Sequence, residues 1–365
     1  MKDLNLQHIA QLDHLRLLAA LLVFGFHLFH QYFGHWQPAP YAAAFGLISE
    51  GHTGVALFFV LSGFLFMSIA LQGGDIDYKK FIRNRFLRIF PLFLFFFFIA
   101  ISVGRDTFRA ADVFYLAFSN LGLAPTSGSF ITGAAWTISI EFTFYLVFPF
   151  LANSVRQEGW PFLARVLLLM LMVKLGAYAV SQRPVHMMYS TLVGRFDQFI
   201  WGMLGAWIWH HQQPLLRRKG RWLLPLALGF LWGATTLQAR HASQFLPEPQ
   251  IAWLIWGTIE AIAWCAVTIT YLASQLPVPA GIGRMLRWGA DRSYSLYFWH
   301  GLVIFSVQQY LGVWSPSASV SVNALLNALV LLPVCLFVAH LSYVTIELPF
   351  LGLRSQYVAR PTPVR

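Results

Sequence analysis

Charged residues are scarce in this sequence. Of its 365 residues only 11% are Asp, Glu, Lys or Arg, whereas these make up about 25% of an ordinary soluble domain. Hydrophobic residues account for 58%, and the mean hydropathy is +0.60. This composition excludes an ordinary soluble domain and predicts an all-α, polytopic membrane protein.

Cysteine is almost absent, and acidic residues are few. Cys265 and Cys335 both lie inside apolar segments, so they predict neither a disulfide framework nor a metal site. The 14 acidic residues stand against 25 Lys and Arg, a formal net charge of +11. Because most basic residues lie in short loops between apolar segments, they indicate membrane topology rather than a nucleic-acid partner. We expect no cleavable signal peptide, because the first apolar stretch is too long and no small-residue cleavage site follows it.

The sequence predicts about ten transmembrane helices, each near the 20 residues that a bilayer needs. A further apolar piece, 112–124, is short enough to be re-entrant or interfacial. An even number of spans puts both termini on one side, where we count seventeen basic residues against five on the other. The positive-inside rule then predicts that both termini are cytoplasmic (N-in, C-in), in a multi-pass protein of the cytoplasmic membrane. The ten predicted spans are 12–32, 54–72, 88–103, 136–153, 162–180, 195–210, 222–238, 250–273, 294–313 and 322–345.

A single domain accounts for nearly the whole chain. We assign residues 1–353 to one transmembrane domain and 354–365 to a short cytoplasmic tail, whose last residues we expect to be disordered. We expect the outer loops, 33–53 and 104–135, to shape specificity. No inverted repeat of the kind that organises many transporters is evident.

The first span carries two ionisable side chains. Arg16 and His27 are eleven positions apart, which places them on one helix face about 16 Å apart along the axis. Ionisable groups inside a membrane are costly and usually mark a functional path. The alternative is that Arg16 extends to the interface while His27 hydrogen-bonds a neighbouring helix.

The fourth span adds a carboxylate. Under the predicted topology Glu141 lies at about the depth of His27. A carboxylate near an imidazole can fix its tautomer and raise its basicity. A structural pair that joins two helices is the alternative.

Two other stretches allow competing interpretations. Arg85 and Arg88, three positions apart, form either an anchor to anionic lipid or a clamp for phosphate groups. Ser62, before Gly63, could act as a nucleophile, but close helix packing is favoured because no base adjoins it in the sequence.

The remaining polar positions give weaker signals. Arg195 and Asp197 lie at the outer mouth of the sixth span, where Gly202 permits tight packing. A buried, hydrogen-bonded role is favoured for His300. We expect Glu347 to form an ion pair with one of the inner arginines.

Taken together, seven motifs resemble the acyltransferase-3 family of integral-membrane acyltransferases. Any one is weak, but all seven occur in family order over nearly the whole chain. Two departures are Thr137, where Ser is common, and Gln198, where an acid is common. The motifs are Arg16-x10-His27, FFVLSGF at 58–64, Arg85-Phe-Leu-Arg88-Ile-Phe-Pro91, Trp136-Thr-Ile-Ser-Ile-Glu141-Phe-Thr-Phe-Tyr145, Arg195-Phe-Asp197-Gln-Phe199, Ser293-Tyr-Ser-Leu-Tyr297-Phe-Trp-His300 and Tyr343-Val-Thr-Ile-Glu347-Leu-Pro-Phe350.

The resemblance implies an enzyme that transfers an acyl group, commonly acetyl from acetyl-CoA, to a hydroxyl of an extracytoplasmic carbohydrate or small natural product. Some relatives carry a fused hydrolase-like domain, which we do not expect in this chain. The expected partners are acyl-CoA, the hydroxyl-bearing acceptor and the lipid bilayer, with no nucleic acid and no metal.

We combine the resemblance with the depth argument into one hypothesis. Arg85 and Arg88 hold the CoA phosphates at the cytoplasmic face, with Arg16 near the entry of the pantetheine arm. His27, held by Glu141 or a water molecule, acts as general base on the acceptor hydroxyl.

Arg195 and Asp197 are the substrate-binding candidates. The competing class is a multi-span transporter for an acidic or acylated solute, since buried ionisable residues can also form a transport path.

Overall fold

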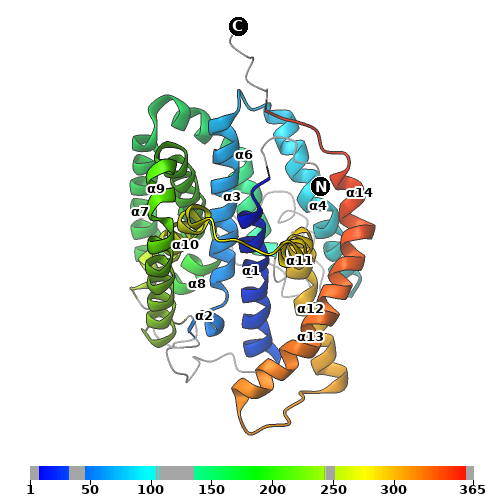
Figure 1. Cartoon of the computed structure of the whole chain (residues 1–365). Coiled ribbons are helices and arrows are strands. Elements are labelled where there is room, and N and C mark those ends of the chain that lie inside the picture. The colour runs from blue at the N-terminus through cyan, green and yellow to red at the C-terminus, as the bar shows by residue number, and fades with distance from the viewer. Residues whose placement is uncertain are drawn as a thin grey trace.

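The computed structural model describes residues 8–32, 46–103, 106, 135–241, 243 and 251–358. In these ranges the chain is helical, apart from loops and one antiparallel bridge between Ile76 and Val358. Figure 1 shows the helices as a bundle with α3 near its centre. The elements are α1 (Ala10–His27) with a π-helical turn (Leu28–Tyr32), α2 (Gly46–Ser49), α3 (Thr53–Gln72), α4 (Tyr78–Val103), α6 (Ala135–Glu158), α7 (Trp160–Val180), α8 (Pro184–Ser190), α9 (Leu192–His241), α10 (Trp253–Ser274), α11 (Ala280–Asp291), α12 (Ser293–Leu311), α13 (Val320–Ser342), a second π-helical turn (Tyr343–Glu347) and α14 (Leu348–Leu351).

The structure confirms an all-α polytopic membrane protein. Eight helical segments of the described chain are long and apolar enough to cross a bilayer. Large apolar side chains face outward, for example Leu169 and Met172 of α7, each 59% exposed, as expected where lipid is the neighbour. The segment Pro184–His241 contains both the sixth and the seventh predicted span, while α12 is not among the eight. The number ten and the N-in, C-in orientation remain predictions.

Helix α9 is two antiparallel arms rather than one straight rod. Gln212 breaks it with non-helical backbone angles (φ −118°, ψ 16°). In a straight helix Arg195 and Gln238 would be about 65 Å apart. Instead, Gln238 Nε2 lies 3.4 Å from His52 Nε2, and the Glu260 carboxylate that binds Arg195 lies 3.8 Å from the same ring. The two arms correspond to the predicted spans 195–210 and 222–238.

Glycines allow α3 and the first arm of α9 to approach closely. A Cβ atom on Gly63 would lie 2.0 Å from the Phe199 carbonyl oxygen, and one on Gly202 would lie 2.1 Å from the Val60 carbonyl oxygen. No larger residue fits at these crossings without movement of the backbone. The packing interpretation of Gly63 and Gly202 is confirmed.

The two ends of the bundle can be told apart by its loops. We call the end where Gln72 finishes α3 and Tyr78 begins α4 the α3–α4 end. Arg156, near the last turn of α6, binds Asp75 of that loop at 2.9 Å, so α6 runs toward this end. The described C-terminal segment also lies there, in the upper part of Figure 1. Under the predicted topology this end is cytoplasmic.

Candidate active site

A cavity of about 240 Å³ opens among α1, α3, α4, α6, α11, α12 and the C-terminal segment. Its wall brings together Arg16, Arg85 and Arg88, the three arginines that the sequence analysis assigned to binding of acyl-CoA. Two arginines that the sequence analysis did not single out, Arg287 and Arg354, line it too. Five guanidinium groups and three carboxylates, those of Asp13, Glu141 and Asp291, therefore line one cavity, and the excess of positive charge suits an anionic ligand.

Only two of these five arginines have an ion pair among the described residues. Arg88 binds Glu347 at 2.9 Å, which confirms the expected pairing of Glu347 with an inner arginine, and Arg16 lies 3.5 Å from Asp13. Arg85 instead stacks over Phe66 at 4.8 Å, and its Nε–H is buried with no hydrogen-bond partner. A buried donor without an acceptor is costly. The cavity thus has unused capacity to bind an anion.

Halfway along the cavity wall, one carboxylate binds two hydroxyl groups. The Ser62 hydroxyl donates to Glu141 Oε1 at 2.9 Å, and the Tyr145 hydroxyl makes a short hydrogen bond to the same oxygen. All three residues line the cavity. The expected contact with His27 is absent from the hydrogen bonds of Glu141. Equal depth along two helices does not fix the direction in which each side chain points.

His27 pairs with a different residue, His300 of α12. His300 Nε2 lies 3.1 Å from His27 Nδ1, and each Nδ1 lies 2.9 Å from a carbonyl oxygen of its own helix, at Val23 and Leu296 respectively. Because a carbonyl only accepts hydrogen bonds, each Nδ1 carries the proton in the neutral ring. We assign the lone pair of neutral His27 to Nε2 on this geometry, which makes Nε2 its basic atom.

Two hydroxyl groups lie between the cavity and this histidine pair. Thr137 Oγ1 and the Tyr297 hydroxyl are 2.9 Å apart and both residues line the cavity. The Tyr297 ring lies 6.1 Å from the His300 ring, which lies 4.8 Å from that of His27. His27 itself does not line the cavity. It lies beyond the Thr137–Tyr297 pair.

The spacing along α6 orders these groups by depth. Tyr145, Glu141 and Thr137 are four positions apart, so they share one face at steps of about 6 Å. Since α6 runs toward the α3–α4 end, Tyr145 is nearest the arginines and Thr137 is farthest from them. Proceeding inward from the α3–α4 end, the order is arginines, Ser62–Glu141–Tyr145, Thr137–Tyr297 and then the histidine pair.

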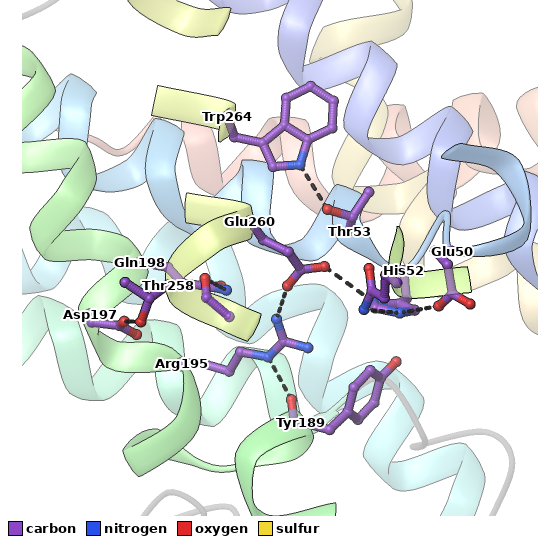
Figure 2. A network of polar contacts seen from close by, with 12 residues as sticks. Glu50, His52, Thr53, Tyr189, Arg195, Asp197, Gln198, Thr258, Glu260 and Trp264 are labelled. Carbon is purple, nitrogen blue, oxygen red and sulfur yellow. Dashed lines mark hydrogen bonds and ion pairs between the residues drawn. The ribbon is translucent and has the colours of Figure 1, made fainter. Parts of the chain in front are cut away.

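Arg195 and Asp197 lie elsewhere, in a buried polar network among α7, α9 and α10 (Figure 2). Arg195 donates to Glu260 at 2.7 Å and to the Tyr189 carbonyl oxygen at 2.7 Å. Asp197 accepts from Lys174 at 2.7 Å and from the Thr258 hydroxyl. Neither Arg195 nor Asp197 lines the cavity, and their assignment to substrate binding remains a prediction.

The sequence analysis missed Lys174 and Glu260. Both are fully buried, at 1% and 2% exposure. The available signal was a lone ionisable residue inside an otherwise apolar span. In the part of the chain that the structure describes, no group of three or more His, Cys, Asp or Glu side chains could hold a metal ion.

Comparisons with known proteins place this chain among acyltransferases. The family model described as an acyltransferase domain matches residues 9–344. The chain is 25% identical to the peptidoglycan O-acetyltransferase OatA of Listeria monocytogenes, over 94% of this chain and 56% of OatA. It is 26% identical to Nodulation protein 10 of Rhizobium leguminosarum, over 97% of this chain and 96% of that protein.

A third relative is acyltransferase MdmB of Streptomyces mycarofaciens, 33% identical over 41% of this chain and 40% of MdmB. No solved structure matches. The chain spans only about half the length of the OatA proteins. The family match nevertheless covers nearly the whole chain. This chain therefore belongs to the acyltransferase-3 family of integral-membrane acyltransferases.

Proposed function

We propose that this protein is a membrane O-acyltransferase that takes an acyl group, acetyl in the simplest case, from cytoplasmic acyl-CoA. It passes the group to a hydroxyl of an extracytoplasmic carbohydrate or small natural product. The observation that carries the proposal is the cavity, which leads from five arginines to a layer of hydroxyl groups beside the histidine pair. Similarity to OatA, which is named a peptidoglycan O-acetyltransferase, supports this choice of acceptor class.

The cavity wall fits the donor's phosphates. Guanidinium groups bind phosphate oxygens through paired hydrogen bonds, and Arg85 has a buried Nε–H without an acceptor. A cavity of about 240 Å³ is smaller than the ~300–1,000 Å³ typical of ligand sites. It suits the narrow pantetheine arm, with the bulky nucleotide held at the mouth among the arginines.

In this proposal His27 acts as general base. Its Nε2 takes the proton of the acceptor hydroxyl while the oxygen attacks the thioester carbonyl carbon. The C–O bond forms, the C–S bond breaks, and the proton passes to the thiolate to give CoA thiol. An alcohol needs such help because its unaided pKa lies far above 7. His300 is the positioning residue, since its Nε2 accepts from His27 Nδ1–H.

Glu141 and the Arg195–Asp197 network receive supporting roles. Glu141 would hold the Ser62 and Tyr145 hydroxyls along the path of the thioester arm. Arg195 binds Glu260, which lies 3.8 Å from His52 at the start of α3, the end opposite the arginines, while Asp197 binds Lys174 and Thr258. Arg195 and Asp197 would fix the α9–α10 wall on the acceptor side.

The test is release of free CoA thiol by the purified protein supplied with acetyl-CoA and a set of hydroxyl acceptors. Release that depends on an acceptor is expected. The buried ion pairs of Lys174 and Arg195 could also belong to a carrier for acidic solutes. If the purified protein moves such a solute across a vesicle membrane and consumes no thioester, it is a carrier and the transferase proposal is wrong.

A further inference from the structure

The segment Arg354–Val358, which the sequence analysis assigned to the short cytoplasmic tail, is held against the start of α4. Asn84, only 1% exposed, donates through Nδ2 to the Ser355 carbonyl oxygen at 2.5 Å and accepts from the Ser355 N–H at 3.1 Å through Oδ1. The Asp77 N–H donates to the Tyr357 carbonyl oxygen at 2.8 Å. One side-chain amide and one backbone donor therefore fix this segment at the cavity mouth.

Apolar packing holds the same segment in place. Tyr357 and Val358 are 3% and 5% exposed, and the Tyr357 ring meets Phe81 edge-on at 5.2 Å. A Cβ atom on Gly73 would lie 2.1 Å from Val358 Cγ1, so the absence of a side chain at Gly73 makes room for Val358. The last residues beyond Val358 lie outside the described ranges.

Fastening this segment places Arg354 on the cavity wall near Arg85 and Arg88. Arg354 is half-buried, and among the described residues it has no ion pair. Burial, and after it the positive charges of Arg85 and Arg88, lower the pKa of Arg354 to about 10. Arg354 stays charged at neutral pH, and its neighbours repel it. A multiply charged anion in the mouth would relieve that repulsion.

The neutrality of Asn84 matters in this setting. Its amide pairs with Ser355 as a backbone peptide would, both donating and accepting. An aspartate could only accept, and its negative charge would compensate Arg85 and Arg88. Asn84 thus fixes the segment without reducing the positive charge of the mouth.

We propose that Arg354, with Arg287 of α11, forms a phosphate-binding rim that holds the nucleotide end of the acyl-CoA donor, and that Asn84 positions this rim. The inference rests on the proposed function, which directs the thioester inward and leaves the phosphates at the mouth. Arg287 lines the same cavity as Arg354, and among the described residues it too has no ion pair. A lipid headgroup offers the same phosphate chemistry, so the test must separate the two sources.

The test compares Arg354→Gln and Asn84→Asp with the control Arg284→Gln. Arg284 is exposed on the same helix as Arg287, lies outside the cavity lining, and its replacement removes the same charge. Binding of CoA and of pantetheine, which lacks the phosphates, is measured by calorimetry in nanodiscs of neutral lipid and in nanodiscs that also contain anionic lipid. KM and kcat are then measured with acetyl-CoA and with acetyl-pantetheine.

We expect Arg354→Gln to weaken CoA binding and raise the KM for acetyl-CoA by about tenfold, the order expected for one charged hydrogen bond. Binding of pantetheine and kcat should stay within about twofold of wild type. Asn84→Asp should act in the same direction, and Arg284→Gln should match wild type.

Unchanged CoA affinity in Arg354→Gln overturns the inference, and so does an equal loss for CoA and pantetheine, which would indicate a general structural role. If Arg354→Gln changes the affinity for CoA only in discs that contain anionic lipid, the rim binds lipid headgroups and the donor assignment is wrong. A wild-type protein that neither binds CoA nor turns over thioester contradicts the proposed function itself. If the wild type turns over acetyl-CoA and Arg354→Gln does so with unchanged KM, only the proposed phosphate-binding rim is contradicted.

Discussion

At the scale of single residues, the site depends on which partner each polar side chain has. Glu141 binds two hydroxyl groups through one oxygen, and His27 shares its Nδ1–H between a carbonyl oxygen and His300. Both arrangements are hydrogen-bonded inside a low-dielectric interior, where leaving a polar group unsatisfied is expensive. The most informative variants therefore separate the charge of a side chain from its hydrogen-bonding capacity.

Glu141 can be tested in this way. Glu141→Ala removes both the charge and the acceptor for Ser62 and Tyr145, and we expect it to abolish transfer while the protein still inserts and folds. Glu141→Gln keeps a carbonyl oxygen that accepts from the same hydroxyls, so it should retain measurable turnover. Thiol release and size-exclusion profiles provide the measurements. Full turnover in Glu141→Ala would remove this residue from the account.

At the scale of elements, the short connection between α2 and α3 carries a buried acid and a buried imidazole. Burial raises the pKa of Glu50 to about 7 and lowers that of His52 to about 4. Glu50 and His52 are 2.9 Å apart, with His30, Glu260 and Arg195 around them. The two shifts have opposite consequences for stability.

The folded protein keeps Glu50 protonated between its ordinary pKa of 4.5 and about 7, so this group makes stability fall as pH rises through that window. His52 stays neutral in the folded state while the unfolded chain binds a proton below 6.5, so stability rises with pH from about 4 to 6.5. In the wild type the two slopes oppose each other.

Glu50→Gln removes the opposing effect of Glu50, so we predict that the rise of stability with pH caused by His52 is no longer offset. The melting temperature of this variant should rise relative to wild type as pH goes from about 4.5 to 7, measured by fluorescence in detergent. The control Asp75→Asn, at a position that is 96% exposed, should follow the wild type. A constant difference between Glu50→Gln and wild type across this range would show that Glu50 does not titrate as described.

The crossing of α3 and α9 gives a prediction about packing. Gly63→Ala would drive a methyl group to 2.0 Å from the Phe199 carbonyl oxygen, so the helices must separate and the melting temperature should fall by several degrees. Gly229→Ala on the second arm of α9 meets no atom within 4 Å and should be neutral or slightly stabilising. Equal melting temperatures for the two variants would mean that the crossing is not tight.

At the scale of the whole molecule, composition and apolar run length were sufficient to predict the membrane class and most helices, because a bilayer imposes length and polarity on every span. The family motifs then indicated Arg16, Arg85 and Arg88, which do share one cavity. These signals are local in the chain. They need no knowledge of how the helices pack.

The features that escaped prediction depend on packing. The pairing of His27 with His300 joins residues 273 positions apart, and helix depth alone could not select it over Glu141. Asn84 and Ser355, which hydrogen-bond to each other, are 271 positions apart, and nothing in the sequence around Ser355 indicates this partner. Lys174 and Glu260 were visible as isolated charges, but their partners in α9 depend on how α7, α9 and α10 face one another.

The central claim is that His27 removes the proton from the acceptor hydroxyl. It is tested most directly by thiol release from acetyl-CoA in the presence of acceptor, with wild type beside His27→Ala and a control, His210→Ala, at an exposed histidine. We predict that His27→Ala loses at least about a hundredfold in kcat, the contribution of a general base, while CoA binding and folding persist and His210→Ala matches wild type. Wild-type turnover in His27→Ala would contradict it.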